Sequence, residues 1–166
     1  MNDTYVEVMV PRKKNPFLTP VKIILYVLAV LFVLIGMGNG LYFIGAAVFG
    51  ALAYFYIPTL DLEYEYLFVE REISIDKIMS KEKRKNAYNV DLNKMEIIAP
   101  ASSHELDSYR SRGLKTYDFT SGNEDAKVYS IVYETGVEGC VLVNIEPNEE
   151  MLKALKNVFP RKVVEY

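Results

Sequence analysis

Residues 23–60 contain no charged side chain, and this long apolar segment constrains the chain more than any other feature. A helix that crosses a hydrocarbon core of about 30 Å needs about 20 residues, because each residue advances it by about 1.5 Å. One helix over the whole segment would be nearly twice that length. The segment is interrupted at residues 36–40 by three glycines and an asparagine, which are typical of turns. We therefore expect a transmembrane helical hairpin over residues 21–57, with helices at 21–37 and 41–57.

The hairpin has two alternatives, a secretory signal peptide and a buried helix pair of a soluble protein. A signal peptide has a short basic region and one apolar stretch of about 7–15 residues, whereas here a longer polar region comes first and a second apolar stretch follows. A buried helix pair would need more apolar chain around it than the remaining residues supply. In lipid, backbone polar groups must be satisfied internally, so two membrane helices are the structure we expect.

Basic residues predict the orientation of the hairpin. Four of them precede or open the first helix: Arg12, Lys13, Lys14 and Lys22. The turn between the helices carries none, and positive charge stays preferentially in the cytoplasm. We expect residues 1–20 to form a cytoplasmic N-terminal segment and residues 61–166 to return to the cytoplasm. Cys140, the single cysteine, can form no intrachain disulfide and agrees with this location in a multi-pass cell-membrane protein.

The apolar helices show no sign of transport, because ion and proton pathways are normally marked by titratable residues within the bilayer. The second helix instead carries small residues four positions apart, Ala46 with Gly50 and Ala47 with Ala51. This spacing allows close approach of helix backbones. It indicates either packing of the second helix on the first or a homo-oligomer contact through Ala46 and Gly50.

Residues 61–166 have the size of one domain and are net acidic, with 15 Lys and Arg against 20 Asp and Glu. Alternation of apolar and polar residues predicts a series of strands in this region. We expect them at 62–69, 73–75, 88–92, 96–99, 114–120, 128–133 and 137–145. Residues 5–10 also alternate and predict a short N-terminal strand, which would cover an open edge of the sheet.

Two helices are expected among these strands. Ser102 and Glu105 have the spacing of a capping box, which predicts a short helix that stops before Gly113. A longer C-terminal helix is expected after Pro147, with one apolar stripe that must be buried against the sheet. The stripe contains Met151, Leu152, Leu155, Val158 and Phe159.

The segments Tyr88–Glu96, Ile145–Leu152, Tyr117–Gly122 and Pro160–Val163, taken together with the hairpin, resemble a family of small bacterial membrane proteins. Its members have two N-terminal transmembrane helices and a bacterial pleckstrin-homology-like (PH-like) domain. The resemblance implies a membrane-anchored α+β fold, in which the hairpin precedes an antiparallel bent β-barrel of about seven strands capped by a C-terminal helix. It implies no catalytic activity.

The sequence offers no catalytic, cofactor or metal site, and we expect that the protein is not an enzyme. His104 is the only histidine and is expected to be structural or solvated, and Cys140 is expected to be a small buried residue of a strand. No phosphate-binding glycine motif is present. Glu63 and Glu65 are interpreted as the wet face of a strand. Asp118 is interpreted as a turn residue, with a polar ligand pocket as the alternative.

Two groups of basic residues are candidates for contact with the anionic surface of a membrane. One group is expected in a loop after the second strand of the domain: Lys81, Lys83, Arg84 and Lys85. The other lies before the first apolar helix: Arg12, Lys13 and Lys14. The alternatives are a solvated loop for the first group and a topology signal for the second. Nucleic acid is not an expected partner, because the domain is net acidic.

These features together predict a non-enzymatic binding or scaffold protein that presents a PH-like domain at the cytoplasmic membrane face. The expected partners are the lipid bilayer and a protein that the sequence does not identify, and no cofactor is expected. The alternative is an accessory subunit of a membrane enzyme or transporter complex whose activity lies in a partner.

Overall fold

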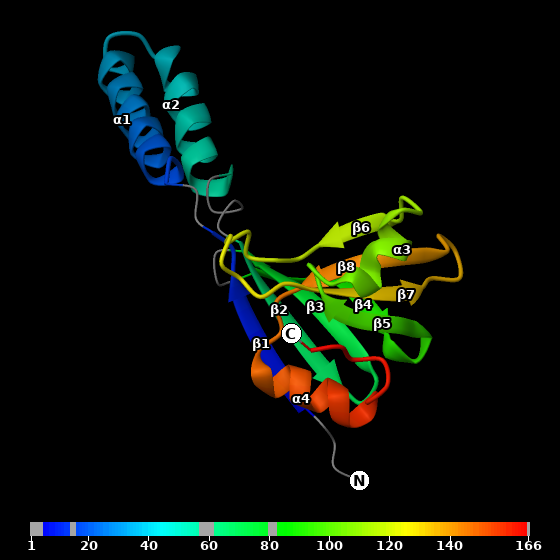
Figure 1. Ribbon diagram of the computed structural model, residues 1–166. Coiled ribbons are helices and arrows are strands. Elements are labelled where there is room, and N and C mark those ends of the chain that lie inside the picture. Colours follow the sequence, from blue (N-terminus) through cyan, green and yellow to red (C-terminus); the bar gives the residue numbers. More distant parts are fainter. Residues whose placement is uncertain (1–4, 14–15, 57–61, 80–82, 166) are drawn as a thin grey trace. The chain divides into compact units, whose positions relative to one another are not determined.

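The structure is a computed structural model that describes residues 5–13, 16–56, 62–79 and 83–165. Its contacts divide the chain into two compact units, which are described separately (Figure 1). The first unit holds the sheets and consists of Met1–Arg12, Glu63–Ile78 and Arg84–Tyr166. The second holds the apolar helices and consists of Lys13–Leu62 and Met79–Lys83.

The helical unit contains helix α1, Leu18–Gly36, and helix α2, Tyr42–Ala51, which a π-helical segment continues over Leu52–Tyr56. The expected break is present, and its Asn39 accepts a hydrogen bond from the Leu41 amide at 3.1 Å. Among the described residues, α1 is the one helix long and apolar enough to cross a membrane. The second apolar helical stretch, Tyr42–Phe55, is shorter, and its expected end at residue 57 lies outside the described residues.

Helices α1 and α2 pack against each other through aromatic rings and glycines. The Phe32 ring lies 5.2 Å from the Phe49 ring, measured between centroids. A Cβ on Gly45 would lie only 2.4 Å from Phe32, so a side chain at this position would have to displace the Phe32 ring. No neighbouring atom lies within 4 Å of a Cβ placed on Gly50. The packing of α2 on α1 therefore uses Gly45, and the expectation that Gly50 mediates it is wrong.

The first sheet has the order β1-β2-β3-β4. Its strands are β1, Tyr5–Pro11, β2, Leu62–Val69, β3, Glu72–Met79, and β4, Lys83–Asp91. Strand β1 is the expected N-terminal strand, and it pairs antiparallel with β2, from Tyr5 opposite Val69 to Pro11 opposite Glu63. Strand β4 begins earlier than expected. Lys83, Arg84 and Lys85 therefore lie in a strand, and their interpretation as a loop is wrong.

The second sheet has the order β5-β7-β8-β6. Its strands are β5, Met95–Pro100, β6, Lys115–Asp118, β7, Tyr129–Glu134, and β8, Cys140–Ile145. The seven strands expected after the hairpin are thus present as β2–β8. Strand β6 nevertheless pairs with β8 in parallel, contrary to an all-antiparallel arrangement. Strand β8 lies between β6 and β7 and runs antiparallel to β7.

Among the described strands the backbone pairing forms two four-stranded sheets, where one bent barrel was expected. Apolar side chains of both sheets form one core, which includes Tyr66, Phe68, Ile75 and Ile131. Aromatic side chains connect the edge strands β4 and β6, where the Tyr88 and Tyr117 ring centroids lie 4.6 Å apart.

Two helical segments follow strands of the second sheet along the chain. A short 3-10 turn, His104–Leu106, continues into α3, Asp107–Arg110, and Ser103 caps it in place of the expected Ser102. Helix α4, Glu149–Val158, begins at Asn148, whose side chain accepts a hydrogen bond from the Met151 amide at 2.8 Å. Its buried residues Met151, Ala154 and Leu155 belong to the core, which confirms the predicted burial of the apolar stripe.

Candidate functional site

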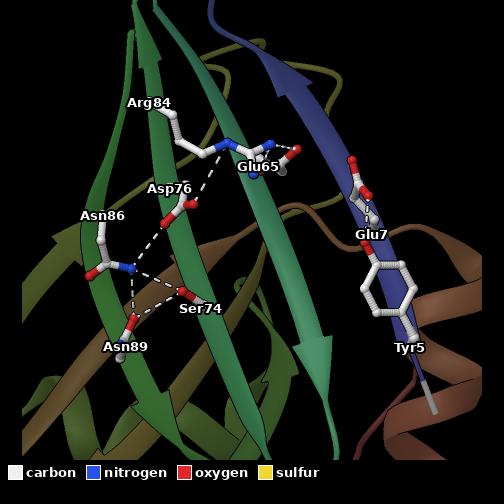
Figure 2. A network of polar contacts seen from close by, with 8 residues as sticks. All are labelled: Tyr5, Glu7, Glu65, Ser74, Asp76, Arg84, Asn86 and Asn89. Carbon is white, nitrogen blue, oxygen red and sulfur yellow. Dashed lines mark hydrogen bonds and ion pairs between the residues drawn. The ribbon is translucent and has the colours of Figure 1, made fainter. Parts of the chain in front are cut away.

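A network of polar side chains spans all four strands of the first sheet on its outer face, the side turned away from the core (Figure 2). Alternation places the odd-numbered residues of β1 and β2 on this side, because their even-numbered neighbours are buried. The network contains Tyr5 and Glu7 of β1, Glu65 of β2, Ser74 and Asp76 of β3, and Arg84, Asn86 and Asn89 of β4.

The centre of the network is an ion pair between a buried carboxylate and an arginine. Glu65 is only 4% exposed, and its carboxylate lies 2.5 Å from Arg84 Nη2. Arg84 reaches across β3, where its Nε lies 3.9 Å from the Asp76 carboxylate. The interpretation of Glu65 as part of a wet strand face is therefore wrong. Arg84 is also not a free cation, since two carboxylates neutralise it.

Two neighbouring carboxyl groups, Glu65 and Glu7, have pKa values that shift in opposite directions. Burial, followed by hydrogen bonding to Glu7, raises the pKa of Glu65, while the Arg84 charge opposes that rise. The pKa of Glu7 is lowered, first by the hydrogen bond that the Tyr5 hydroxyl donates at 2.8 Å and then by hydrogen bonding to Glu65. Of the two groups, Glu65 is therefore the one that holds a proton more readily.

The other half of the network is uncharged apart from Asp76. The Asn86 amide donates to Ser74 Oγ at 2.9 Å, to Asp76 Oδ1 at 2.9 Å and to Asn89 Oδ1 at 2.8 Å. Residues three apart lie on opposite faces of a regular strand, so strand β4 must be irregular between Asn86 and Asn89. These contacts bind β4 to β3 on the outer face, in addition to the backbone pairing.

An open pocket of about 510 Å³ adjoins the network at Ser74. Residues around the β2–β3 turn and at or just after the end of β4 line it: Leu67, Val69, Glu70, Arg71, Glu72, Ser74, Asp91 and Asn93. Arg71 belongs to one wall, where its Nη1 donates to Asn93 Oδ1 at 3.2 Å and its guanidinium lies 6.0 Å from the Phe159 ring centroid. The pocket volume is within the range of pockets that hold small ligands or side chains.

The basic candidates do not form one cluster in the described structure. Lys83 and Lys85 are exposed on β4, and Arg12 and Lys13 are exposed directly after β1. Arg84 belongs to the polar network. Lys81 and Lys14 lie outside the described residues.

Three other candidate residues have structural surroundings. His104 is exposed, and its Nδ1 lies 3.1 Å from Asp107 Oδ2. Cys140 is half-buried rather than buried as expected, and burial beside Glu96 raises the pKa of its thiol. Asp118 Oδ1 accepts a hydrogen bond from the Thr120 amide at 3.2 Å, as its interpretation as a turn residue predicted. No group of three or more His, Cys, Asp or Glu residues in the described chain is arranged to hold a metal ion.

Sequence reasoning missed the network and the pocket because both assemble residues from different strands. One signal was present for Glu65, which lies between the core aromatics Tyr64 and Tyr66 in the sequence. No comparable signal marked the pocket, whose walls come from the β2–β3 turn and the chain after β4.

The two sheets and the C-terminal helix define a PH-like α+β domain. The family model described as bacterial PH-like domain (DUF6106) matches residues 2–165, so the chain belongs to this family. The matched region includes the apolar helices as well as the sheets. No curated protein and no solved structure matches the chain.

Proposed function

We propose that this protein is a non-enzymatic binding or scaffold protein, anchored by a two-helix membrane hairpin and presenting its PH-like domain at the cytoplasmic membrane face. The family supports a binding role for the domain. The observation that carries the membrane topology is the pairing of β1 with β2, because the apolar helices lie between these two strands along the chain.

Strand pairing restricts the number of membrane crossings. Pro11, the last residue of β1, lies opposite Glu63, near the start of β2. A chain that leaves one end of a sheet and returns to the same end must cross a bilayer an even number of times. This supports two crossings, even though only α1, among the described helices, has the usual length of a membrane span. The α2 region compensates for its shorter length by local thinning of the bilayer or by anchoring of the flanking residues.

Basic residues at this end of the first sheet favour contact with anionic lipid headgroups. Parallel neighbours need a connection of about a dozen residues, whereas β2, β3 and β4 follow one another closely along the chain and are therefore antiparallel. Lys83 at the start of β4 thus lies at the same end of the first sheet as Arg12 after β1. Arg12 precedes α1 by only a few residues. Each basic residue near an anionic surface contributes about 1 kcal/mol to membrane association.

Membrane fractionation tests the anchoring. The full chain should stay in the membrane pellet after washing with alkaline carbonate. A hairpin-replacement variant, in which a Gly/Ser linker replaces residues 18–56, should be released while keeping β1 on the sheet. Release of the full chain by carbonate would contradict an integral hairpin.

Flotation tests the lipid contact separately. The hairpin-replacement variant should float with anionic vesicles at low salt. The substitutions Lys83→Gln and Lys85→Gln should reduce the floating fraction, whereas Lys153→Gln and Lys156→Gln on α4 remove the same charge and should not. Equal flotation of all three proteins would show that β4 does not contact lipid.

A further inference from the structure

The pocket beside Ser74 combines an apolar floor with an acidic rim. Leu67 and Val69 of β2 supply the floor on the outer face, and Val69 is 38% exposed. Glu70 and Glu72 stand at the β2–β3 turn beside this floor. A long side chain that carries an aliphatic stem and a charged head matches such a surface, because lysine and arginine lay their stems on apolar atoms and keep the charge at the rim.

The carboxylates of the rim are available to a ligand. Within the described part of the chain, neither the Glu70 nor the Glu72 carboxylate has a hydrogen-bond or ion-pair partner. Arg71 lines the same pocket but donates to Asn93, and Arg84 is paired with Glu65 and Asp76. Three acidic residues of the lining, Glu70, Glu72 and Asp91, stand against one basic residue, Arg71, so the pocket has an excess of negative charge.

The negative charge of the pocket distinguishes among the ligands that could occupy it. An anionic lipid headgroup would be repelled by Glu70 and Glu72. A second copy of the chain that bound through the same face would place carboxylates against carboxylates. A cationic segment of another protein has the complementary charge, and its lysine or arginine stems fit the floor of Leu67 and Val69.

We propose that the pocket formed by Leu67, Val69, Glu70 and Glu72 docks a lysine- or arginine-bearing segment of a partner protein. This inference rests on the binding role proposed above and is independent of the membrane topology. It assigns opposite partners to two parts of the first sheet, lipid at the basic end near Arg12 and a cationic protein segment at the β2–β3 turn.

Fluorescence anisotropy with the full chain in neutral detergent micelles tests the proposal. The probes are a labelled decalysine peptide and a decamer of 2,4-diaminobutyrate, which has the same charge but two fewer methylene groups per side chain. Decalysine should bind, and the shorter side chains should bind at least threefold more weakly, because they reach less of the apolar floor. Absence of decalysine binding at low salt, or equal affinity for both peptides, would overturn the proposal.

Paired variants locate the binding. Glu70→Gln with Glu72→Gln should weaken decalysine binding at least fivefold. Glu124→Gln with Asp125→Asn changes the net charge equally at exposed positions elsewhere and should change it less than twofold. Equal weakening by the two pairs would show non-specific attraction and overturn the proposal, whereas carbonate extraction of the full chain would count only against the membrane anchor.

Discussion

At the scale of single residues, Glu65 and Arg84 hold the outer face of the first sheet together. The carboxylate is buried, so its charge is costly unless a cation compensates it. Arg84 supplies that charge from two strands away. Because burial raises the pKa of Glu65, the folded protein binds this proton more tightly than the unfolded chain does. Ionisation of Glu65 therefore opposes folding as the pH rises, and Arg84 offsets this effect.

Removing the arginine should expose this pH dependence. Arg84→Ala in the hairpin-replacement variant should lower the free energy of unfolding by about 1–3 kcal/mol near pH 8, because a buried carboxylate loses its partner. The loss should be smaller near pH 5, where Glu65 is protonated for more of the time. Urea unfolding at both pH values measures this change in the free energy of unfolding. Lys83→Ala, on the same strand, is the control and should change stability by less than about 0.5 kcal/mol. A loss independent of pH would contradict the role given to Glu65.

Glu70 has a backbone conformation that residues other than glycine rarely adopt. Its φ is 55°, the left-handed region that favours glycine. Glu70→Gly should therefore raise the free energy of unfolding by about 0.5–1 kcal/mol while weakening decalysine binding. The control Glu72→Gly also removes a glutamate side chain, but from strand β3, where glycine is unfavourable. It should lower the free energy of unfolding by about 0.5–1 kcal/mol. If Glu70→Gly also destabilised the protein, the carboxylate of Glu70 would have a structural role.

At the scale of elements, α4 belongs to the core of the domain. Leu155 is fully buried among side chains of that core. Leu155→Ala should lower the free energy of unfolding by about 2–5 kcal/mol, as expected for a cavity in a packed core. Lys153→Ala on the exposed side of the same helix is the control. Chemical denaturation of the hairpin-replacement variant measures both, and similar values would mean that α4 is only peripheral.

The contact of α1 with α2 depends on a position without a side chain. Gly45→Val should force the Phe32 ring to move and should cost about 1–3 kcal/mol of helix packing. Gly50→Val adds the same atoms where no neighbour lies within 4 Å. The melting temperature of the full chain in detergent should fall for the first variant and stay unchanged for the second. A fall for Gly50→Val alone would instead indicate a contact between copies.

Local pattern was sufficient to predict which elements form. Alternation over Leu62–Val69 and the apolar stripe of α4 each report burial of one face, and both are confirmed. The strand β4 was predicted too short because the charges of Lys83, Arg84 and Lys85 resemble a loop when their partners on β2 and β3 are unknown. The parallel pairing of β6 with β8 was missed because pairing between distant strands leaves no trace in the periodicity of either strand.

The candidate site was predictable only in part for the same reason. Arg12 and Lys13 are exposed, as residues expected to contact a membrane surface must be. The fold determines what distinguishes the other two residues. Glu65 is buried, and Glu70 has a positive φ in the β2–β3 turn. Neither property can be obtained from residue type or spacing alone.

In the whole molecule, the proposed topology has the apolar segment leave and re-enter one end of the first sheet, with only its turn beyond the membrane. The pairing of β1 with β2 ties both ends of the segment to the same domain. The matched family region contains this domain together with the apolar helices. The family match, which begins at residue 2, is consistent with β1 being part of the domain.

Cysteine labelling in intact spheroplasts tests this topology. In a Cys140→Ser background, single cysteines replace Met9 on β1, Asn39 in the helix turn and Glu124 in the domain. A membrane-impermeant maleimide should label position 39 in intact spheroplasts, and positions 9 and 124 only after lysis. Labelling of position 9 or 124 without lysis, or protection of position 39, would contradict a two-crossing anchor with both ends in the cytoplasm.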